Sequence, residues 1–163
     1  MANKFSLTKG RPVFIIDLSL IPIFILVIYS GLKLHVAGHG IDHDKWEFWA
    51  GCHTITCQIS LILIWFHVKA HWGWYKGLIK NGLANKSKIT AGITILFLAL
   101  TITGFLLTFF INGPNSSIGL WHYKLGLITS ILIIIHTIKR FPIMMKGIRR
   151  KKKSCAEMAE KAA

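Results

Sequence analysis

Apolar positions dominate four stretches of this chain, and each stretch is about as long as a membrane-spanning helix. The four stretches are Val13–Leu34, Phe48–Val68, Ile89–Ile111 and Gly119–Ile138. The second and third contain no Asp, Glu, Lys or Arg over 21 and 23 residues, whereas Asp17, Lys33 and Lys124 interrupt the other two. A helix needs about 20 residues to cross a hydrocarbon core about 30 Å thick. The pattern predicts an all-α integral membrane protein, a bundle of four helices.

The spans leave no room for a separate soluble domain. We expect a cytoplasmic N-terminal tail at residues 1–12, a single four-span domain at residues 13–140 and a basic C-terminal tail at residues 141–163. The first apolar stretch is longer than the apolar core of a signal peptide. We therefore expect the first helix to be retained.

Charge separates the two sides of the predicted bundle. The chain has 20 Lys plus Arg and 6 Asp plus Glu, for a net charge of +14. The N-terminal tail, the loop between the second and third spans and the C-terminal tail hold most of the basic residues, whereas the first loop holds Lys45 beside three acids. The positive-inside rule then places both termini in the cytoplasm.

The basic residues flank the membrane spans, and this position argues against a nucleic-acid partner. No basic groove interleaved with aromatic residues is evident. The run Arg149–Lys153 is instead typical of a segment that contacts anionic headgroups of membrane lipids.

Four histidines inside the spans carry the candidate chemistry. The second span contains His53 and His67, and the fourth contains His122 and His136. Each interval is 14 residues, which is 40° short of four full helical turns and about 21 Å along the axis. Each pair therefore shares one helix face, with one imidazole near each membrane surface. An imidazole inside a membrane is costly unless it is paired, so these residues indicate a functional site.

Connectivity predicts how the four histidines meet. The second and fourth of four spans run in the same direction, so His53 faces His122 at the outer level and His67 faces His136 at the inner level. Two facing imidazoles supply both axial ligands of a haem iron. The sequence lacks Cys-x-x-Cys-His, so we expect two non-covalent b-type haems and take the four histidines as iron ligands.

Small residues recur near these histidines and predict a duplicated two-helix unit. Ser30-Gly31 ends the first span, and Thr103-Gly104 lies near the end of the third. Ser60 and Thr129 each follow an outer-level histidine by seven positions. We take Gly31 and Gly104 as cofactor-binding positions, since glycine lets a backbone approach a flat macrocycle closely; ordinary helix packing is the alternative.

The chain resembles the four-helix dihaem core of membrane b-type cytochromes, and most closely the small flavinylation-associated bacterial cytochromes. The residues that carry the resemblance are Arg11-Pro12, Ile16-Asp17-Leu18, Leu20, Ser30-Gly31, His53 and His67-Val68-Lys69-Ala70-His71-Trp72-Gly73-Trp74. The resemblance covers roughly Arg11 to Arg140. It implies electron transfer with quinones or quinols, and with redox partner subunits or a flavoprotein, in the bacterial cytoplasmic (inner) membrane.

The predicted function is electron transfer across the membrane, as a quinol- or quinone-linked cytochrome b subunit of a redox complex. Two histidine ligands close both axial positions of each iron, so chemistry on oxygen or small substrates at the iron is not expected. We assign no catalytic residue. Any catalysis is expected to be quinol oxidation or quinone reduction at a haem edge.

Two alternatives belong to other functional classes. A haem-free metal-ion transporter would use the intramembrane imidazoles together with His35, His39 and His43 at the outer mouth. A membrane anchor for a redox protein would use its histidines only for packing. The three outer-mouth histidines could also belong to a solvated polar loop, bind an additional haem or accept protons from quinol.

The remaining polar residues have two readings each. Asp17 is expected to pair with Arg11 or Lys88, or to relay protons at an inner quinone site. His71 could replace His67 as a ligand, but we expect it to join Trp72, Trp74 and Tyr75 in an interfacial aromatic belt. Four basic residues at the depth of the haem edges could bind haem propionates or extend to the membrane surface: Lys33, Lys124, Lys139 and Arg140.

Overall fold

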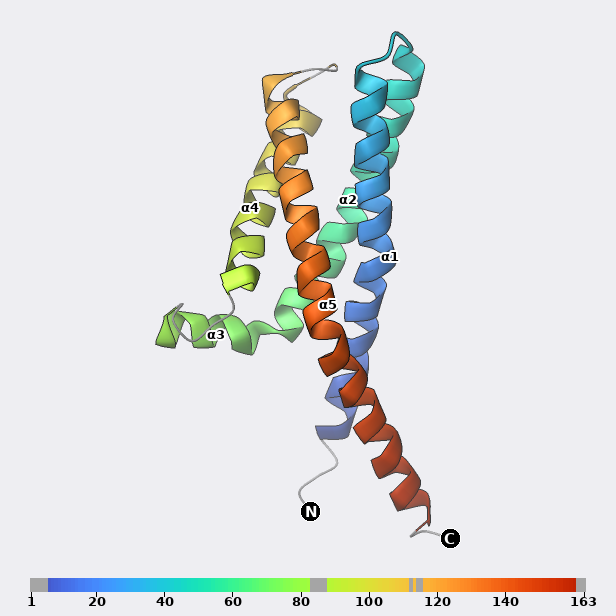
Figure 1. The fold of residues 1–163 in the computed structure, drawn as a ribbon, viewed down its shortest axis with the longest axis vertical. Helices are drawn as coiled ribbons and strands as arrows, with labels where there is room; N and C mark the ends of the chain where they lie inside the picture. Colours follow the sequence, from blue (N-terminus) through green and yellow to red (C-terminus); the bar gives the residue numbers. More distant parts are fainter. Residues whose placement is uncertain (1–5, 83–87, 112, 114–115, 161–163) are drawn as a thin grey trace.

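Helices account for all regular secondary structure in the described part of the chain, residues 6–82, 88–111, 113 and 116–160. The computed structural model contains α1 (Ser6–Gly38), α2 (His43–Ala70), α3 (Trp72–Asn81), α4 (Lys88–Phe109) and α5 (Ser117–Glu160) (Figure 1). Four segments are long and apolar enough to cross a membrane: Val13–Gly38, His43–Ala70, Lys88–Phe109 and Ser117–Pro142. The all-α prediction with four potential spans is thus confirmed.

The long helices are arranged as two antiparallel pairs. α1 packs along α2, and α4 packs along α5, whereas the two pairs meet less extensively and mainly through α1 and α5. Figure 1 shows the start of α1, the end of α5 and the short helix α3 at one end of the bundle. The α1–α2 and α4–α5 connections lie at the opposite end.

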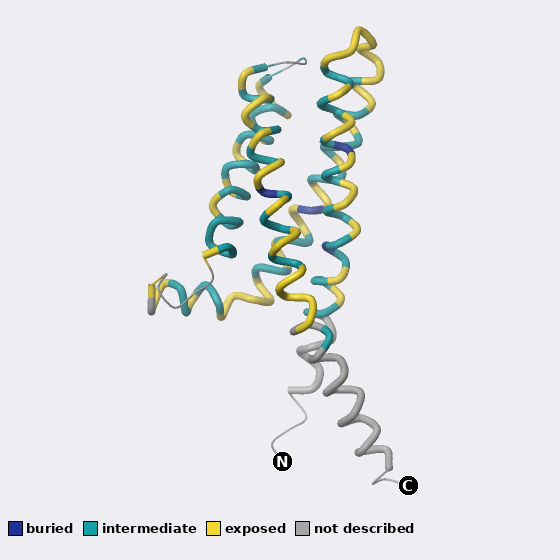
Figure 2. Tube along the Cα trace, viewed as in Figure 1, coloured by how far each residue is buried: buried dark blue, intermediate teal, exposed yellow. Residues whose placement is uncertain are grey.

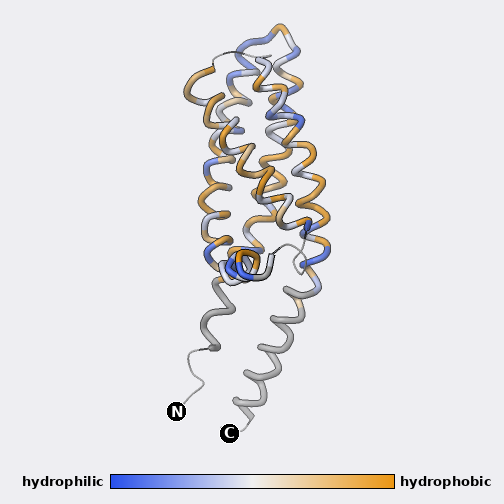
Figure 3. The backbone as a smooth tube through the Cα atoms, turned by 90° about the vertical axis from the view of Figure 1, so that its left-hand side faces the viewer, coloured by the Kyte–Doolittle hydropathy of each residue, from blue (hydrophilic) through white to orange (hydrophobic). Residues whose placement is uncertain are grey.

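Large apolar side chains cover the outside of the bundle, and very few side chains are buried inside it. Of the described residues, the buried ones are Leu20, Ser30, Ser60 and Thr129, with relative exposures of 6%, 3%, 4% and 2% (Figure 2). Hydrophobic residues line the length of the helices, and hydrophilic ones gather toward the ends and on α3 (Figure 3). A water-soluble bundle has its apolar residues inside and its polar residues outside. Apolar residues on the outside are expected for helices that face lipid.

Hydroxyl groups within the spans are satisfied by the helices that carry them. Thr101, Thr108 and Ser130 donate to the carbonyls of Phe97, Gly104 and Gly126 at 2.9, 2.8 and 2.7 Å. Such bonds to the carbonyl four residues earlier allow polar side chains to remain in an apolar environment. No described buried side-chain nitrogen or oxygen lacks a partner.

Asp42 caps the start of α2. Its side chain accepts a hydrogen bond from the Lys45 backbone amide at 3.1 Å and lies 2.9 Å from the Lys45 Nζ. The side-chain and backbone hydrogen bonds from Lys45 both stabilise the charged form, so the pKa of Asp42 lies below its ordinary value. The capped helix end fixes the short connection from α1.

The helix α3 was not predicted from the sequence. It follows α2 after His71, whose backbone amide donates to the His67 carbonyl at 3.0 Å. It ends at Asn81 and is capped by Gly82, where φ is +70°. α3 lies across the end of the bundle (Figure 1). The Tyr75 hydroxyl reaches Thr94 on α4 at 3.2 Å, which ties α3 to the second helix pair.

Candidate intramembrane histidine site

The outer-level histidines come together as the sequence predicts. The rings of His53 on α2 and His122 on α5 have centroids 6.3 Å apart and planes inclined at 82°. The two residues are separated by 69 positions in the chain, and they bring one helix of each pair into contact. The structure therefore places two nitrogen-ligand side chains opposite one another between the pairs.

Each outer-level imidazole is held by a hydroxyl group on the helix paired with its own. Ser30 Oγ on α1 lies 3.0 Å from His53 Nδ1, and Thr103 Oγ1 on α4 lies 2.8 Å from His122 Nδ1. Ser30 also donates to the Val27 carbonyl at 3.1 Å, and Thr103 donates to the Ala99 carbonyl at 2.9 Å. A hydroxyl has one proton to donate, so this network assigns the Nδ1 proton to each imidazole as the donor.

That assignment leaves the other ring nitrogen as a lone-pair donor. A neutral imidazole carries its proton on one nitrogen only, and the hydrogen bond at that nitrogen sets which one is free to bind a metal. The Cys57 thiol lies 3.5 Å from His53 Nε2, where its S–H can donate to the same lone pair. The hydrogen bonds therefore leave the Nε2 atoms of His53 and His122 with the electronic form that a metal ion requires.

The two predicted cofactor-binding glycines lie directly against these imidazoles. A Cβ atom on Gly31 would lie 3.1 Å from Cε1 of His53, and one on Gly104 would lie 3.3 Å from Cε1 of His122. Both distances are tighter than ordinary van der Waals contact. A side chain at either position would thus require the ring of the neighbouring helix to move by a few tenths of an ångström, and contact with a macrocycle remains a prediction.

The inner-level histidines are not in ring contact with each other. His67 lies beside His71, with centroids 4.6 Å apart, and no ring contact joins it to His136 in the described part of the chain. His136 Nδ1 lies 3.5 Å from Thr90 Oγ1 on α4. The structure brings the outer pair together and leaves the inner facing of His67 and His136 a prediction.

Asp17 on α1 joins two histidines of α2. Its Oδ1 lies 2.8 Å from His67 Nδ1, and its Oδ2 lies 3.2 Å from His71 Nε2. One ligand atom from each of the three residues lies within 4.8 Å of the others, which makes them a candidate metal-binding group. The alternative that Asp17 pairs with Lys88 is wrong, since the described contacts of its carboxyl group are with these two histidines. The Arg11 side chain lies outside the described residues.

The described ring contacts of His71 are on α2, and its place in an interfacial aromatic belt stays a prediction. Its ring contacts His67 and the Asp17 carboxylate rather than Trp72, Trp74 or Tyr75, which contact one another on α3. The sequence held a usable signal, because histidines four positions apart lie on the same helix face. The contribution of Asp17 depends on how α1 is rotated against α2, which spacing along one helix does not reveal.

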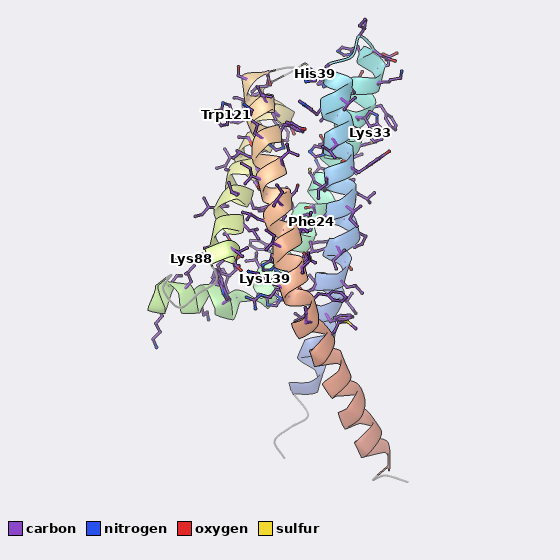
Figure 4. The ribbon with its side chains drawn as sticks, in the orientation of Figure 1. Phe24, Lys33, His39, Lys88, Trp121 and Lys139 are labelled. Carbon is purple, nitrogen blue, oxygen red and sulfur yellow. The ribbon has the colours of Figure 1, made fainter. Side chains whose placement is uncertain are left out.

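The outer-mouth histidines do not form one cluster. His35 stacks on Tyr123 with ring centroids 3.7 Å apart, and His39 lies 4.7 Å from His35. His43 instead lies against Trp46 at 5.4 Å. Figure 4 shows His39 near the end of the bundle opposite α3. Among the described residues, the only group of three or more potential metal ligands is the one at Asp17.

Two basic residues at the predicted depth of the haem edges extend over aromatic rings. Lys33 Nζ lies 5.7 Å from the centroid of Tyr29, and Lys124 Nζ lies 5.4 Å from that of Trp121. Cation–π contacts of this kind stabilise long cationic side chains at a membrane surface. Lys139 lies near the α3 end of the bundle (Figure 4), and it and Arg140 are exposed.

The chain matches no protein-family model, no curated protein and no solved structure. The case for a function therefore depends on the residues and the geometry described above.

Proposed function

We propose that this protein is a membrane cytochrome b that binds two haems through four histidines. The observation that carries the proposal is the opposition of His53 and His122 at 6.3 Å. Metal–imidazole bonds are about 2 Å long, so two ligating nitrogens on opposite sides of one ion lie about 4 Å apart. Imidazole rings that project outward from such nitrogens have centroids at a separation compatible with the one found here.

The surroundings of the outer pair fit a bis-histidine metal centre. Nδ1 of each ring is taken by a hydroxyl, which leaves Nε2 for the metal. Histidine ligands are commonly oriented in this way by a partner on the second nitrogen. When bound, haem iron supplies one-electron chemistry by alternating between the ferric and ferrous states. His53 and His122 would hold the iron from opposite sides and so would keep other ligands away from it.

The inner pair is proposed from the register of the helices. His67 and His136 each follow an outer-level histidine by 14 residues on the same helix. Their Nδ1 atoms have partners on the paired helices, Asp17 and Thr90, as the outer histidines do. One Nδ1 contact to the paired helix at each of the four histidines supports two sites, one at each level, stacked about 21 Å apart along the helices.

The same contacts support duplication of a two-helix unit. Ser30 and Thr103 are 73 positions apart, and so are Asp17 and Thr90. The histidines that these residues contact are 69 positions apart at both levels. Helices α1 and α2 thus use the same relative positions as α4 and α5, and the buried pair Ser60 and Thr129 follows the same 69-residue interval.

Charge supports the orientation that we propose. Lys88 and Lys139 lie toward the α3 end of the bundle (Figure 4), where the basic C-terminal part of α5 also begins. The positive-inside rule assigns this end to the cytoplasm. We place the protein in the bacterial cytoplasmic membrane, where it passes electrons between quinones or quinols and redox partner subunits or a flavoprotein.

The haem content of the purified protein tests this function. The expected result is two b-type haems per chain, measured by a reduced-minus-oxidised spectrum and a pyridine haemochrome assay. His53→Ala and His136→Ala are each expected to lose one haem equivalent. His43→Ala is the matched control, because His43 contacts Trp46 outside the site, and it should retain two. Absence of haem from protein isolated from its native source contradicts the proposal.

The group of Asp17, His67 and His71 supports a second candidate function, metal-ion transport without haem. Two imidazoles and one carboxylate are suitable ligands for zinc and similar divalent ions. This candidate predicts that chelators lower the thermal stability of the protein and that no Soret band is present. His71→Ala would abolish the metal dependence, whereas a cytochrome would keep both haems after this change.

A further inference from the structure

The four histidines proposed as ligands differ in the partner that each has on Nδ1. Three of the partners are hydroxyls, from Ser30, Thr90 and Thr103. The fourth, at His67, is the carboxylate of Asp17, which lies 2.8 Å away and is 20% exposed. An ionised carboxylate accepts a stronger hydrogen bond than a hydroxyl does. The inner level is therefore chemically different from the outer level.

Asp17 has two hydrogen-bond donors and no other described ion partner. His67 Nδ1 donates to Oδ1, and His71 Nε2 lies 3.3 and 3.2 Å from Oδ1 and Oδ2. Both contacts bring ring nitrogens, which can donate N–H bonds, to the acceptor oxygens of the carboxyl group. The position that corresponds to Asp17 in the second helix pair is occupied by Thr90. The difference between the halves thus amounts to one negative charge at one ligand.

A negative charge on the second nitrogen changes the ligand itself. A carboxylate bonded to Nδ1–H of a metal-bound histidine raises the basicity of the ligand. A more basic ligand stabilises the ferric form relative to the ferrous form, which carries one positive charge fewer. Hydrogen bonding around the ligands is one of the means by which a protein sets the potential of its haem.

We propose that Asp17 makes the two haem sites unequal, by lowering the reduction potential of the haem held by His67 and His136 below that of the haem held by His53 and His122. This inference rests on the proposed function. Asp17 acts through His67 and is a positioning residue. Each iron takes up one electron on reduction, so electrons supplied in limited amount fill the outer site first and leave the inner site ferric.

Redox titration of the purified wild-type protein and of Asp17→Asn tests the inference. Asn keeps the shape of the side chain and an acceptor oxygen, and it removes the charge. We expect the lower of the two midpoint potentials to rise in Asp17→Asn by at least about 59 mV. For a one-electron couple, this shift is a tenfold change in the ferric-to-ferrous ratio at fixed potential. The higher midpoint should stay in place. Asp17→Glu should restore most of the separation.

Thr103→Val is the matched control at the outer level. It removes the partner of His122 and leaves Asp17 untouched, so it should shift the higher midpoint and leave the lower one. If Asp17→Asn moves neither midpoint, or moves the one that Thr103→Val moves, the inference is wrong while two bound haems still support the cytochrome. If the wild-type protein binds no haem, the proposed function itself fails.

His71→Leu gives an independent measurement in case Asp17→Asn loses the inner haem. It removes the second donor to the carboxylate and replaces no proposed ligand, so Asp17 accepts more strongly from His67. The lower midpoint should then fall further. An unchanged or raised midpoint in His71→Leu overturns the inference.

Discussion

Gly31 and His53 are in such close contact that the hydrogen atom on the glycine is the largest substituent that fits without a shift. A Cβ atom at position 31 would lie 3.1 Å from Cε1 of the His53 ring. Gly104 and His122 repeat the arrangement at 3.3 Å in the other helix pair. The backbone of one helix thus sets the position of an imidazole on its neighbour.

This contact predicts opposite outcomes for two glycine substitutions. Gly51 is exposed on α2, and a Cβ atom there meets nothing within 4 Å. Gly51→Ala should stabilise the helix by up to about 1 kcal/mol. Gly31→Ala should instead cost about 1–3 kcal/mol through overpacking and, under the proposed function, should release the outer haem faster. Thermal unfolding in detergent measures the change in stability of each variant. Equal stabilities for Gly51→Ala and Gly31→Ala would contradict a tight contact between Gly31 and His53.

The hydrogen bond between the Thr103 hydroxyl and His122 predicts that Thr103→Val will bind the proposed haem less tightly. Valine keeps the shape of threonine but cannot accept the proton on Nδ1, which is 2.8 Å from the hydroxyl. Partners of this kind are worth about 10- to 100-fold in metal affinity. The rate at which haem transfers to an excess of a haem-scavenging protein should rise accordingly. Thr101→Val is the control, because its hydroxyl bonds only the Phe97 carbonyl, and its rate should match the wild type.

Tyr75 and Thr94 should be energetically coupled. Thr94 donates to the Thr90 carbonyl at 2.9 Å, so the Tyr75 hydroxyl is the donor in the 3.2 Å bond between them. A double-mutant cycle with Tyr75→Phe and Thr94→Val should yield a coupling energy of about 0.5–1.5 kcal/mol in thermal unfolding. Additive effects of the two substitutions would mean that α3 is held in place by something other than this bond.

The proposed orientation predicts which cysteines can be labelled from outside the cell. Ile41 lies fully exposed in the α1–α2 connection, so Ile41→Cys in a Cys155→Ser background should react with a membrane-impermeant maleimide in intact cells. Cys155 of the wild-type chain should react only after the cells are opened. The reverse pattern of labelling would invert the orientation and place the basic tail outside.

Asp42 predicts a pH dependence at the start of α2. Its pKa is lower in the folded protein than in the unfolded chain because Lys45 stabilises the carboxylate, so its contribution is fully present above the unfolded pKa of about 3.9. The contribution is lost as the pH falls through the folded pKa. The protection of the Lys45 amide against hydrogen exchange, measured relative to an unstructured chain at the same pH, should therefore decrease at acidic pH. Asp42→Ala should show fast exchange already at neutral pH, and slow exchange in that variant would argue against the cap.

The sequence was sufficient to predict the spans because hydropathy is a local property. The first span was expected at Val13–Leu34 and extends over Val13–Gly38; the third was expected at Ile89–Ile111 and extends over Lys88–Phe109. The meeting of His53 and His122 was also predictable, since connectivity and depth alone put both at one level. Neither prediction required knowledge of how one helix is rotated against another.

The environment of Asp17 did depend on that rotation. The residue lies 50 positions before His67, and nothing in its neighbourhood in the chain indicates which helix face it will meet. The helix α3 was missed for another reason. Its lysines resemble those of a loop at the cytoplasmic surface, although Trp72, Tyr75 and Ile79 recur at the three- and four-residue spacing of a helix.

The pairwise packing of the helices bears on how such a protein is made. α1 and α2 contact each other along their length, so the first hairpin can enter the bilayer and complete its own packing while α4 and α5 are still on the ribosome. Helices that are stable singly in the bilayer can associate in a later step. The contact between His53 and His122 joins the two hairpins, so it would form only when both have been made and have docked.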